Sequence, residues 1–157
     1  MCIRDRTLDT RTLAPGDVFV ALPGAEQDGR DFIESALASG AAAVLMESGR
    51  VLHQDDVRVI PISSLRGELG ALANRLYGSP SDGLKVVAVT GTNGKTSVVD
   101  LTAQLLRLAG RKTGTIGTLG VRLDQQPTET RNTTPDCLAL HRRLGQWRDD
   151  GGRVRDA

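Results

Sequence analysis

Two hydrophobic patterns alternate along this chain: short continuous apolar runs, and longer segments in which apolar residues recur every three or four positions. The continuous runs predict strands that are buried on both faces of a sheet, at residues 18–22, 41–46, 57–62 and 86–89. A glycine-containing segment at 113–123 predicts one further strand. Because these strands alternate with helical segments, the pattern predicts an α/β fold with a mostly parallel sheet.

The helical segments carry recognisable start and stop residues. One is expected from Asp28 to Gly40, and a second after a cap at Ser63 or Ser64. A third spans 95–109, and its apolar stripe comprises Val98, Leu101, Leu105 and Leu108. Thr134 is expected to cap a fourth, which has Pro135 at its first position, ends near residue 151 and carries the stripe Cys137, Leu140, Leu144 and Trp147.

The stretch "GSPSDG" at 78–83 is a cluster of turn-forming residues and predicts a domain boundary. Residues 1–6 show no periodicity and are left as an unassigned leader. The prediction is therefore a small amino-terminal α/β domain at 7–83 and a second domain at 84–157. So few strands follow residue 84 that the second sheet is expected to be cut short.

Composition excludes several classes of protein. Of the 157 residues, 39% are hydrophobic and 25% are charged, which is typical of a globular domain. The net charge is only +1 and no long basic run exists, so nucleic acid is not an expected partner. The longest apolar run, at 41–46, is too short to cross a bilayer, so no membrane association is expected.

Cysteine and histidine content argues against a metal centre or a disulfide framework. The 2 cysteines lie far apart and form no Cys-x-x-Cys pair, and the 2 histidines are equally scattered. Cys137 lies on a helical apolar stripe and is interpreted as core filling. No signal peptide opens the chain, so the expected location is the cytoplasm.

The stretch "VVAVTGTNGKTS" at 86–97 predicts a strand, a phosphate-binding loop and a helix in succession. Gly91 and Gly94 allow a tight turn whose N–H groups approach phosphate oxygens. Lys95 can neutralise the outer phosphates, and the Thr96 hydroxyl can bind Mg²⁺. ATP and Mg²⁺ are therefore the expected ligands.

The loop departs from the strict GxxxxGK[ST] pattern, because Val89 stands where the first glycine is required. A plain structural turn is the alternative interpretation. A GTPase switch is a further alternative, but the Asn-Lys-x-Asp motif that reads guanine does not occur in the sequence.

Four stretches resemble the Mur ligases, the ATP-dependent amide-bond enzymes of peptidoglycan synthesis. They are "TLDTRTLAPGDVFVALPG", "VAVTGTNGKTS", "GTIGTLG" and "NTTPDCLAL". The phosphate loop shows the family's own departure from the strict pattern. The last two stretches resemble the family member that adds the third residue, meso-diaminopimelate or lysine, to UDP-N-acetylmuramoyl-L-alanyl-D-glutamate.

The resemblance also assigns site residues. Uridine-contacting segments match Leu8, Thr10, Ala25, Glu26 and Gln27. The ATP- and Mg²⁺-binding loop matches Gly91, Thr92, Asn93, Gly94, Lys95, Thr96 and Ser97, of which Lys95 and Thr96 are assigned catalytic roles and Thr96 the metal. The muramoyl-binding stretch matches Asn132, Thr133 and Thr134.

The implied reaction phosphorylates a substrate carboxylate with ATP, and an amino acid then attacks the acyl phosphate. The family's Mg²⁺-binding glutamate, carbamylated lysine and carboxy-terminal domain have no counterpart in the sequence, so these residues alone are expected not to ligate. A monomer is expected. Two alternatives stay open: the family member that adds D-alanyl-D-alanine, and a non-catalytic module that binds a UDP-sugar.

Overall fold

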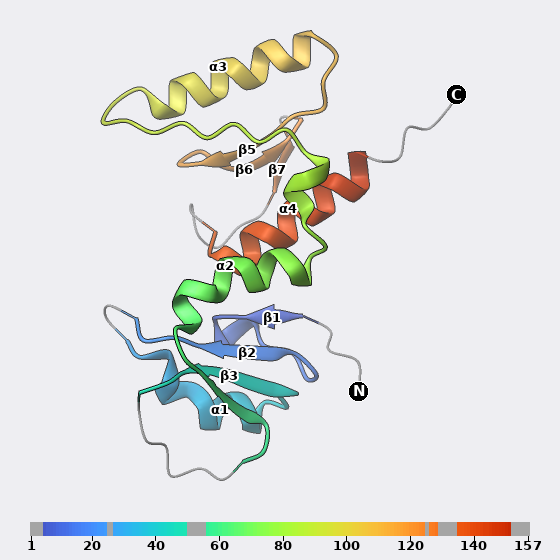
Figure 1. Cartoon of the computed structure of the whole chain (residues 1–157). Coiled ribbons are helices and arrows are strands. Elements are labelled where there is room, and N and C mark those ends of the chain that lie inside the picture. Colours follow the sequence, from blue (N-terminus) through green and yellow to red (C-terminus); the bar gives the residue numbers. More distant parts are fainter. Residues whose placement is uncertain (1–4, 25–26, 50–55, 125, 129–134, 152–157) are drawn as a thin grey trace. The chain divides into compact units, whose positions relative to one another are not determined.

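The computed structural model describes residues 5–24, 27–49, 56–124, 126–128 and 135–151 (Figure 1). The chain forms two compact units. The first runs up to Arg75 and also includes Cys137–Ala139, and the second begins at Leu76 and takes in the chain from Leu140 onward. The boundary expected near residue 83 stays a prediction.

The first unit contains a parallel four-stranded sheet. Its order is β1-β2-β3-β4, with β1 at Arg6–Thr7, β2 at Val18–Ala21, β3 at Ala43–Glu47 and β4 at Val59–Ile62. All three strand pairs are parallel. Every residue of β2 is buried, as its continuous apolar run predicts for a central strand. The α/β fold class with a parallel sheet is therefore confirmed.

The helical segment after β2 has the predicted start and stop residues, but its first turn is a 3₁₀ helix and the α-helix begins only at Ile33. A 3₁₀ turn, η2 (Gly29–Phe32), leads into α1 (Ile33–Ala38). The Asp28 carboxylate accepts a hydrogen bond from the Arg30 N–H and so caps the turn. Gly40, with φ of +87°, follows the helix in the left-handed conformation.

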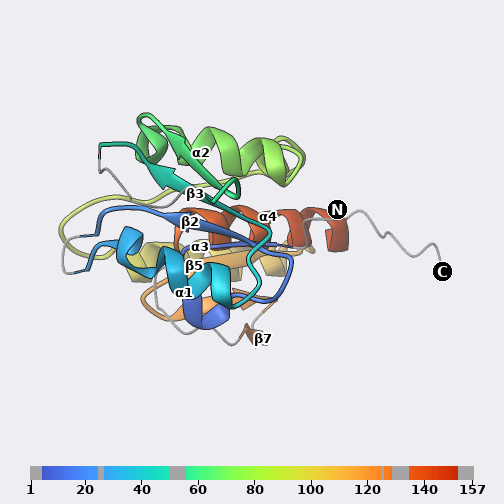
Figure 2. The same ribbon diagram turned by 90° about the horizontal axis from the view of Figure 1, so that it is seen from below.

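Helices α1 and α2 (Leu65–Leu76) lie on opposite faces of this sheet (Figure 2). Alternate residues of β2 and β3 therefore enter different hydrophobic clusters. The cluster on the α1 face contains Phe19, Ala21, Ile33, Ala36, Ala41, Val44 and Met46. The other cluster, on the α2 face, contains Val20, Leu65, Leu69, Ala73 and Leu138.

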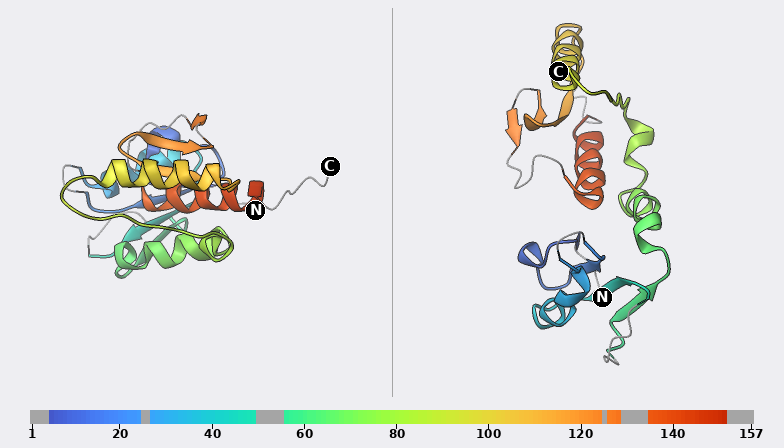
Figure 3. Two further views of the ribbon diagram at one scale, coloured as in Figure 1. Left: turned by 90° about the horizontal axis from the view of Figure 1, so that it is seen from above. Right: turned by 90° about the vertical axis from the view of Figure 1, so that its left-hand side faces the viewer.

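The second unit contains an antiparallel sheet of order β5-β6-β7 (Figure 3). Its strands are β5 (Gly114–Gly117), β6 (Gly120–Leu123) and β7 (Gln126–Thr128). The prediction of a single strand over 113–123 is wrong, because the chain reverses after Gly117 and forms a hairpin. Periodicity within so short a segment does not show that its two halves pair with each other.

A 3₁₀ turn, η3 (Pro80–Gly83), precedes a segment that the sequence predicts as a buried strand at 86–89. This prediction is wrong for the described structure. The segment pairs with no described strand, and Val86 and Val87 are 60% and 70% exposed. A strand needs hydrogen-bonded neighbours as well as apolar residues, and no described strand pairs with this segment.

Helix α3 (Lys95–Leu108) forms as predicted and begins at the expected lysine. Its apolar stripe is nevertheless exposed, because no described element of the unit covers that side. All four residues of the predicted stripe are exposed: Val98, Leu101, Leu105 and Leu108. The predicted helix is therefore confirmed, and the apolar stripe that its period defines is exposed in this unit.

Helix α4 (Cys137–Gly151) begins two residues later than expected, so Pro135 lies outside it. The expected cap, Thr134, falls outside the described residues. Leu138, which the predicted stripe omits, is 2% exposed within the cluster on the α2 face. In the second unit, Arg148 donates hydrogen bonds to the carbonyls of Tyr77 at 3.3 Å and Gly78 at 2.6 Å.

None of the helices within the described ranges has both the length and the apolar character required to span a membrane.

Candidate functional site

The predicted phosphate-binding loop, residues 91–97 (called the phosphate loop below), adopts backbone conformations that favour glycine at two positions. Gly91 has φ of +148° and Gly94 has φ of +77°, both in the region that L side chains rarely adopt. Helix α3 begins directly after Gly94, and the Val98 N–H donates to the Gly94 carbonyl at 2.9 Å. The N–H groups of the first helical turn therefore lie at the end of the loop, where they can bind an anion.

Lys95 directs its charge into this loop. Its Nζ donates hydrogen bonds to the carbonyl oxygens of Gly91 and, at 3.1 Å, Thr92. The positive charge therefore lies at the loop together with the positive end of the helix dipole. All seven residues from Gly91 to Ser97 are exposed, so the predicted site is open to a ligand.

The β5–β6 hairpin brings a second hydroxyl to the loop. Thr96 Oγ1 lies 2.9 Å from Thr118 Oγ1, within hydrogen-bonding distance. The two residues are 22 positions apart, and Thr118 lies in the turn between β5 and β6. The structure therefore adds to the site a residue that the sequence pattern did not indicate.

A pocket of about 180 Å³ adjoins the loop between α3 and the hairpin. Its polar lining includes Lys95, Thr96 and Asp100 from α3, and Thr118 and Arg122 from the hairpin. Asp100 could have been found from the sequence, since it lies one helical turn after Thr96. Because sites for drug-sized ligands commonly measure about 300–1,000 Å³, this pocket can enclose only part of a nucleotide.

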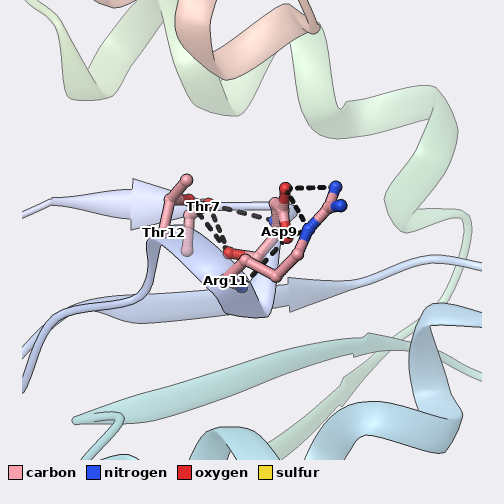
Figure 4. A network of polar contacts seen from close by, with 4 residues as sticks. All are labelled: Thr7, Asp9, Arg11 and Thr12. Carbon is pink, nitrogen blue, oxygen red and sulfur yellow. Dashed lines mark hydrogen bonds and ion pairs between the residues drawn. The ribbon is translucent and has the colours of Figure 1, made fainter. Parts of the chain in front are cut away.

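Two of the predicted uridine-contacting residues follow β1. Leu8 is partly buried against the cluster on the α2 face, so its side chain packs in the hydrophobic core. Thr10 begins the 3₁₀ turn η1 (Thr10–Thr12). Asp9 caps this turn by accepting from the Arg11 N–H at 2.9 Å, and Thr7 Oγ1 lies 2.7 Å from Thr12 Oγ1 (Figure 4).

The second predicted uridine loop follows β2. Gln27 is exposed, and its carbonyl accepts a hydrogen bond from the Gly24 N–H at 3.0 Å. The Gly29 N–H donates to the Leu22 carbonyl at 2.9 Å, which closes the base of the loop. Since β1 and β2 are parallel neighbours, this loop and Thr10 follow the same edge of the sheet, where α/β proteins commonly bind ligands.

Several predicted positions cannot be placed. Ala25, Glu26, Asn132, Thr133 and Thr134 lie outside the described residues. Within the described part of the chain, no group of three or more histidine, cysteine, aspartate or glutamate residues could hold a metal ion. Cys137, which the sequence indicates as core filling, is partly buried against the cluster on the α2 face.

Ion pairs with one spacing recur in the first unit. In each, an aspartate accepts the N–H of the residue two positions later and also binds that residue's guanidinium: Asp9–Arg11, Asp28–Arg30 and Asp56–Arg58. The hydrogen bond from the Arg58 side chain lowers the pKa of Asp56 to about 2. The paired aspartates likewise raise the pKa of Arg11 and Arg30. The arginines near the predicted uridine segments therefore carry balanced charge.

Two sequence models of protein families match this chain. The one described as "Mur ligase family, catalytic domain" matches residues 5–77, and "Mur ligase middle domain" matches residues 89–154. The second match contains the phosphate loop, and the first contains the parallel sheet of the first unit. The chain belongs to the Mur ligase family.

Relatives within this family include proteins named UDP-N-acetylmuramoyl-L-alanyl-D-glutamate–2,6-diaminopimelate ligase. The protein of that name from Pseudomonas putida is 48% identical over 154 residues, covering 97% of this chain and 31% of the relative. The one from Pseudomonas aeruginosa is 46% identical over 156 residues, covering 98% and 32%. The chain thus spans about a third of the length of these relatives.

Solved structures agree with this assignment. A structure of a protein named UDP-N-acetylmuramoyl-L-alanyl-D-glutamate–2,6-diaminopimelate ligase matches with a TM-score of 0.75 and 29% identity, over 95% of this chain and 30% of that one. The MurF ligase from Thermotoga maritima in complex with ADP matches with a TM-score of 0.57 and 27% identity, over 90% of this chain and 29% of that one. The fold is therefore more similar to the first structure.

Proposed function

We propose that this chain belongs to an ATP-dependent ligase that adds the third amino acid to UDP-N-acetylmuramoyl-L-alanyl-D-glutamate in peptidoglycan synthesis (a MurE-type ligase). The observation that carries the proposal is the phosphate loop at the start of α3, with Lys95 directed into it. The relatives' names favour diaminopimelate over lysine as the added residue.

The loop Gly91–Ser97 is proposed to bind the phosphates of ATP. Exposed N–H groups at the start of α3 and the Lys95 ammonium supply positive charge where the phosphates would lie. Such charge stabilises the transferring phosphoryl group, and this stabilisation is most of what phosphoryl transfer requires of a protein. ATP then supplies the phosphoryl group that activates the substrate carboxylate.

Mg²⁺ is proposed to bind at Thr96. A hydroxyl oxygen is a hard donor, and Mg²⁺ in nucleotide sites is commonly held by few protein ligands together with phosphate oxygens and water. The exposed Thr96 hydroxyl at the phosphate loop fits this donor set. Mg²⁺ would neutralise phosphate charge alongside Lys95.

The muramoyl substrate is proposed to bind with its uridine end at the sheet edge that follows β1 and β2. There, the half-buried Thr10 offers a hydroxyl group and the exposed Gln27 offers an amide. Leu8 contributes through its backbone, because its side chain packs in the core. The positions Ala25, Glu26, Asn132, Thr133 and Thr134 keep their assigned substrate roles as part of this proposal.

The reaction would take place in the cytoplasm, where ATP is available, and the protein is proposed to act as a monomer. Size-exclusion chromatography with light scattering would give the mass in solution. A mass of twice 16.7 kDa, independent of concentration, would contradict the monomer.

Calorimetric titration with a non-hydrolysable ATP analogue and Mg²⁺ tests the proposed function. The wild-type chain is expected to bind, and Lys95→Met is expected to weaken binding at least tenfold. Lys112→Met is a matched control, because Lys112 follows the opposite end of α3. Equal loss in both variants would indicate a general charge effect rather than a phosphate site.

A second titration uses the UDP-muramoyl dipeptide, with the UDP-muramoyl tripeptide as comparison. Tighter binding of the dipeptide supports addition of the third residue, whereas tighter binding of the tripeptide favours the MurF-type reaction with D-alanyl-D-alanine. Binding of the dipeptide with no binding of the ATP analogue would leave only a UDP-sugar-binding module.

A further inference from the structure

The contact between Thr96 and Thr118 joins the phosphate loop to the turn of the β5–β6 hairpin. Their Oγ1 atoms are 2.9 Å apart, and both side chains are exposed. The hairpin holds Thr118 in place, because the pairs Ile116–Val121 and Gly117–Gly120 flank a two-residue turn. Val121, at 2% exposure, anchors β6 in the interior of the second unit.

We propose that Thr118 is a positioning residue that orients the Thr96 hydroxyl toward Mg²⁺; the proposal rests on the function proposed above. A threonine hydroxyl has one proton and two lone pairs. Either hydroxyl of this pair can be the donor. When Thr96 donates to Thr118, both lone pairs of Thr96 Oγ1 remain available to a cation.

A cation therefore selects one of the two hydrogen-bond directions. If Thr118 were the donor, its proton would occupy a lone pair of Thr96, and the Thr96 proton would be free to point toward the cation. Partners of this kind fix the orientation of a metal ligand and commonly change metal affinity by about 10- to 100-fold when they are removed. Because Thr96 is exposed and Mg²⁺ keeps bound water, the change in Mg²⁺ affinity is expected near the lower end of this range.

A purely structural role explains the contact less well. Both hydroxyls are exposed and could bond to water instead, so their mutual hydrogen bond adds little to stability. The contact is also specific in location, because it involves the one hydroxyl of α3 that follows the loop lysine directly. The contact is therefore expected to strengthen Mg²⁺-dependent nucleotide binding rather than to stabilise the fold.

The test measures how much Mg²⁺ strengthens binding of the non-hydrolysable ATP analogue to the 157-residue chain, compared with excess EDTA. Thr118→Val keeps the shape of the side chain but removes the acceptor. It is expected to reduce the Mg²⁺-dependent gain in affinity by about 10-fold, while the affinity in EDTA changes less than about twofold. Thr118→Ser restores the acceptor and should restore the gain.

Thr113→Val provides the matched control. The Thr113 hydroxyl donates to the Arg111 carbonyl at 2.9 Å, so this variant also loses an exposed hydroxyl hydrogen bond, next to the same hairpin. It is expected to keep the full Mg²⁺ effect. Circular dichroism melting of each variant would identify loss of folding separately.

The outcomes separate the two proposals. If wild type binds the analogue with a Mg²⁺-dependent gain and Thr118→Val retains that gain, Thr118 is not a positioning residue, and the proposed function stands. If Thr118→Ser fails to rescue Thr118→Val, the positioning role is also wrong. If wild type does not bind the analogue, the phosphate site itself is wrong and the inference on Thr118 is overturned with it.

Discussion

The Glu47 carboxylate accepts a hydrogen bond from the backbone N–H of Arg66 at 2.7 Å. Glu47 ends β3 and Arg66 lies in the first turn of α2, 19 residues later. The glutamate therefore caps this helix from a neighbouring strand, in addition to any cap from the adjacent serines. The Arg66 guanidinium also donates to the Pro23 carbonyl, so Arg66 connects α2 to the loop that follows β2 as well as to β3.

Glu47→Ala should lower the free energy of unfolding of the first unit by about 1 kcal/mol, because it removes a carboxylate from a helix N-terminus. Glu47→Gln keeps an acceptor oxygen without the charge and should lose about half as much. Urea denaturation followed by circular dichroism measures both. Equal stability of Glu47→Ala and wild type would show that the adjacent serines are sufficient as caps.

Gly114 allows β5 to pass directly against the aromatic ring of Trp147. A Cβ at position 114 would lie 2.4 Å from Trp147 Cζ3, too close for the ring to remain where it is. Since Trp147 is the sole tryptophan of the sequence, Gly114→Ala should shift the fluorescence emission to longer wavelength and lower the midpoint of thermal unfolding. Gly117→Ala adds a methyl group to open space on the same strand and should change neither.

Ionisation of Asp56 makes the stability of the first unit depend on pH. Its pKa is lowered to about 2, first by the hydrogen bond from the Arg58 side chain and then by the one from the Arg58 N–H. An aspartate in an unfolded chain titrates near 3.9, so the fold favours the ionised form. The resulting stabilisation is complete above about pH 4 and is lost as the pH falls toward 2.

Arg58→Ala should therefore raise the pKa of Asp56 toward its ordinary range, which carbon NMR of the carboxyl group would detect. Part of the shift should persist, because the backbone N–H at position 58 remains. Arg75→Ala removes an arginine from α2 and should leave the Asp56 titration unchanged. An Asp56 pKa near 4 in the wild type would contradict the ion pair.

Val86 and Val87 lie in a segment that the sequence predicts as a buried strand, whereas the structure shows them exposed. Val87 is 70% exposed, so Val87→Asn should change the free energy of unfolding by no more than about 0.5 kcal/mol. Val20, at 1% exposure in β2, is the comparison, and Val20→Asn should cost about 3 kcal/mol or prevent folding of the first unit. A large loss in Val87→Asn would show that the segment is buried in solution.

Sequence patterns correctly predicted the features that depend on residues close together along the chain. The buried run Val18–Ala21 became β2, Asp28 and Gly40 bounded the first helix, and Lys95 began α3. Each of these outcomes is decided within a few residues, by side-chain volume, by a cap or by the conformational freedom of glycine. The positive φ angles of Gly91 and Gly94 belong to the same group, whereas phosphate binding by this loop stays a prediction.

Contacts between distant positions were decided by the tertiary structure. Pairing of Gly114–Gly117 with Gly120–Leu123 turned one expected strand into a hairpin, and that hairpin placed Thr118 beside Thr96. The segment at 86–89 has the residues of a strand but no described partner, and a strand exists only where a neighbour completes its hydrogen bonds. The sequence by itself determined the family, the parallel sheet and the glycine turn that precedes α3, whereas the exposure of α3 and the second hydroxyl at the loop depended on which segments meet in space.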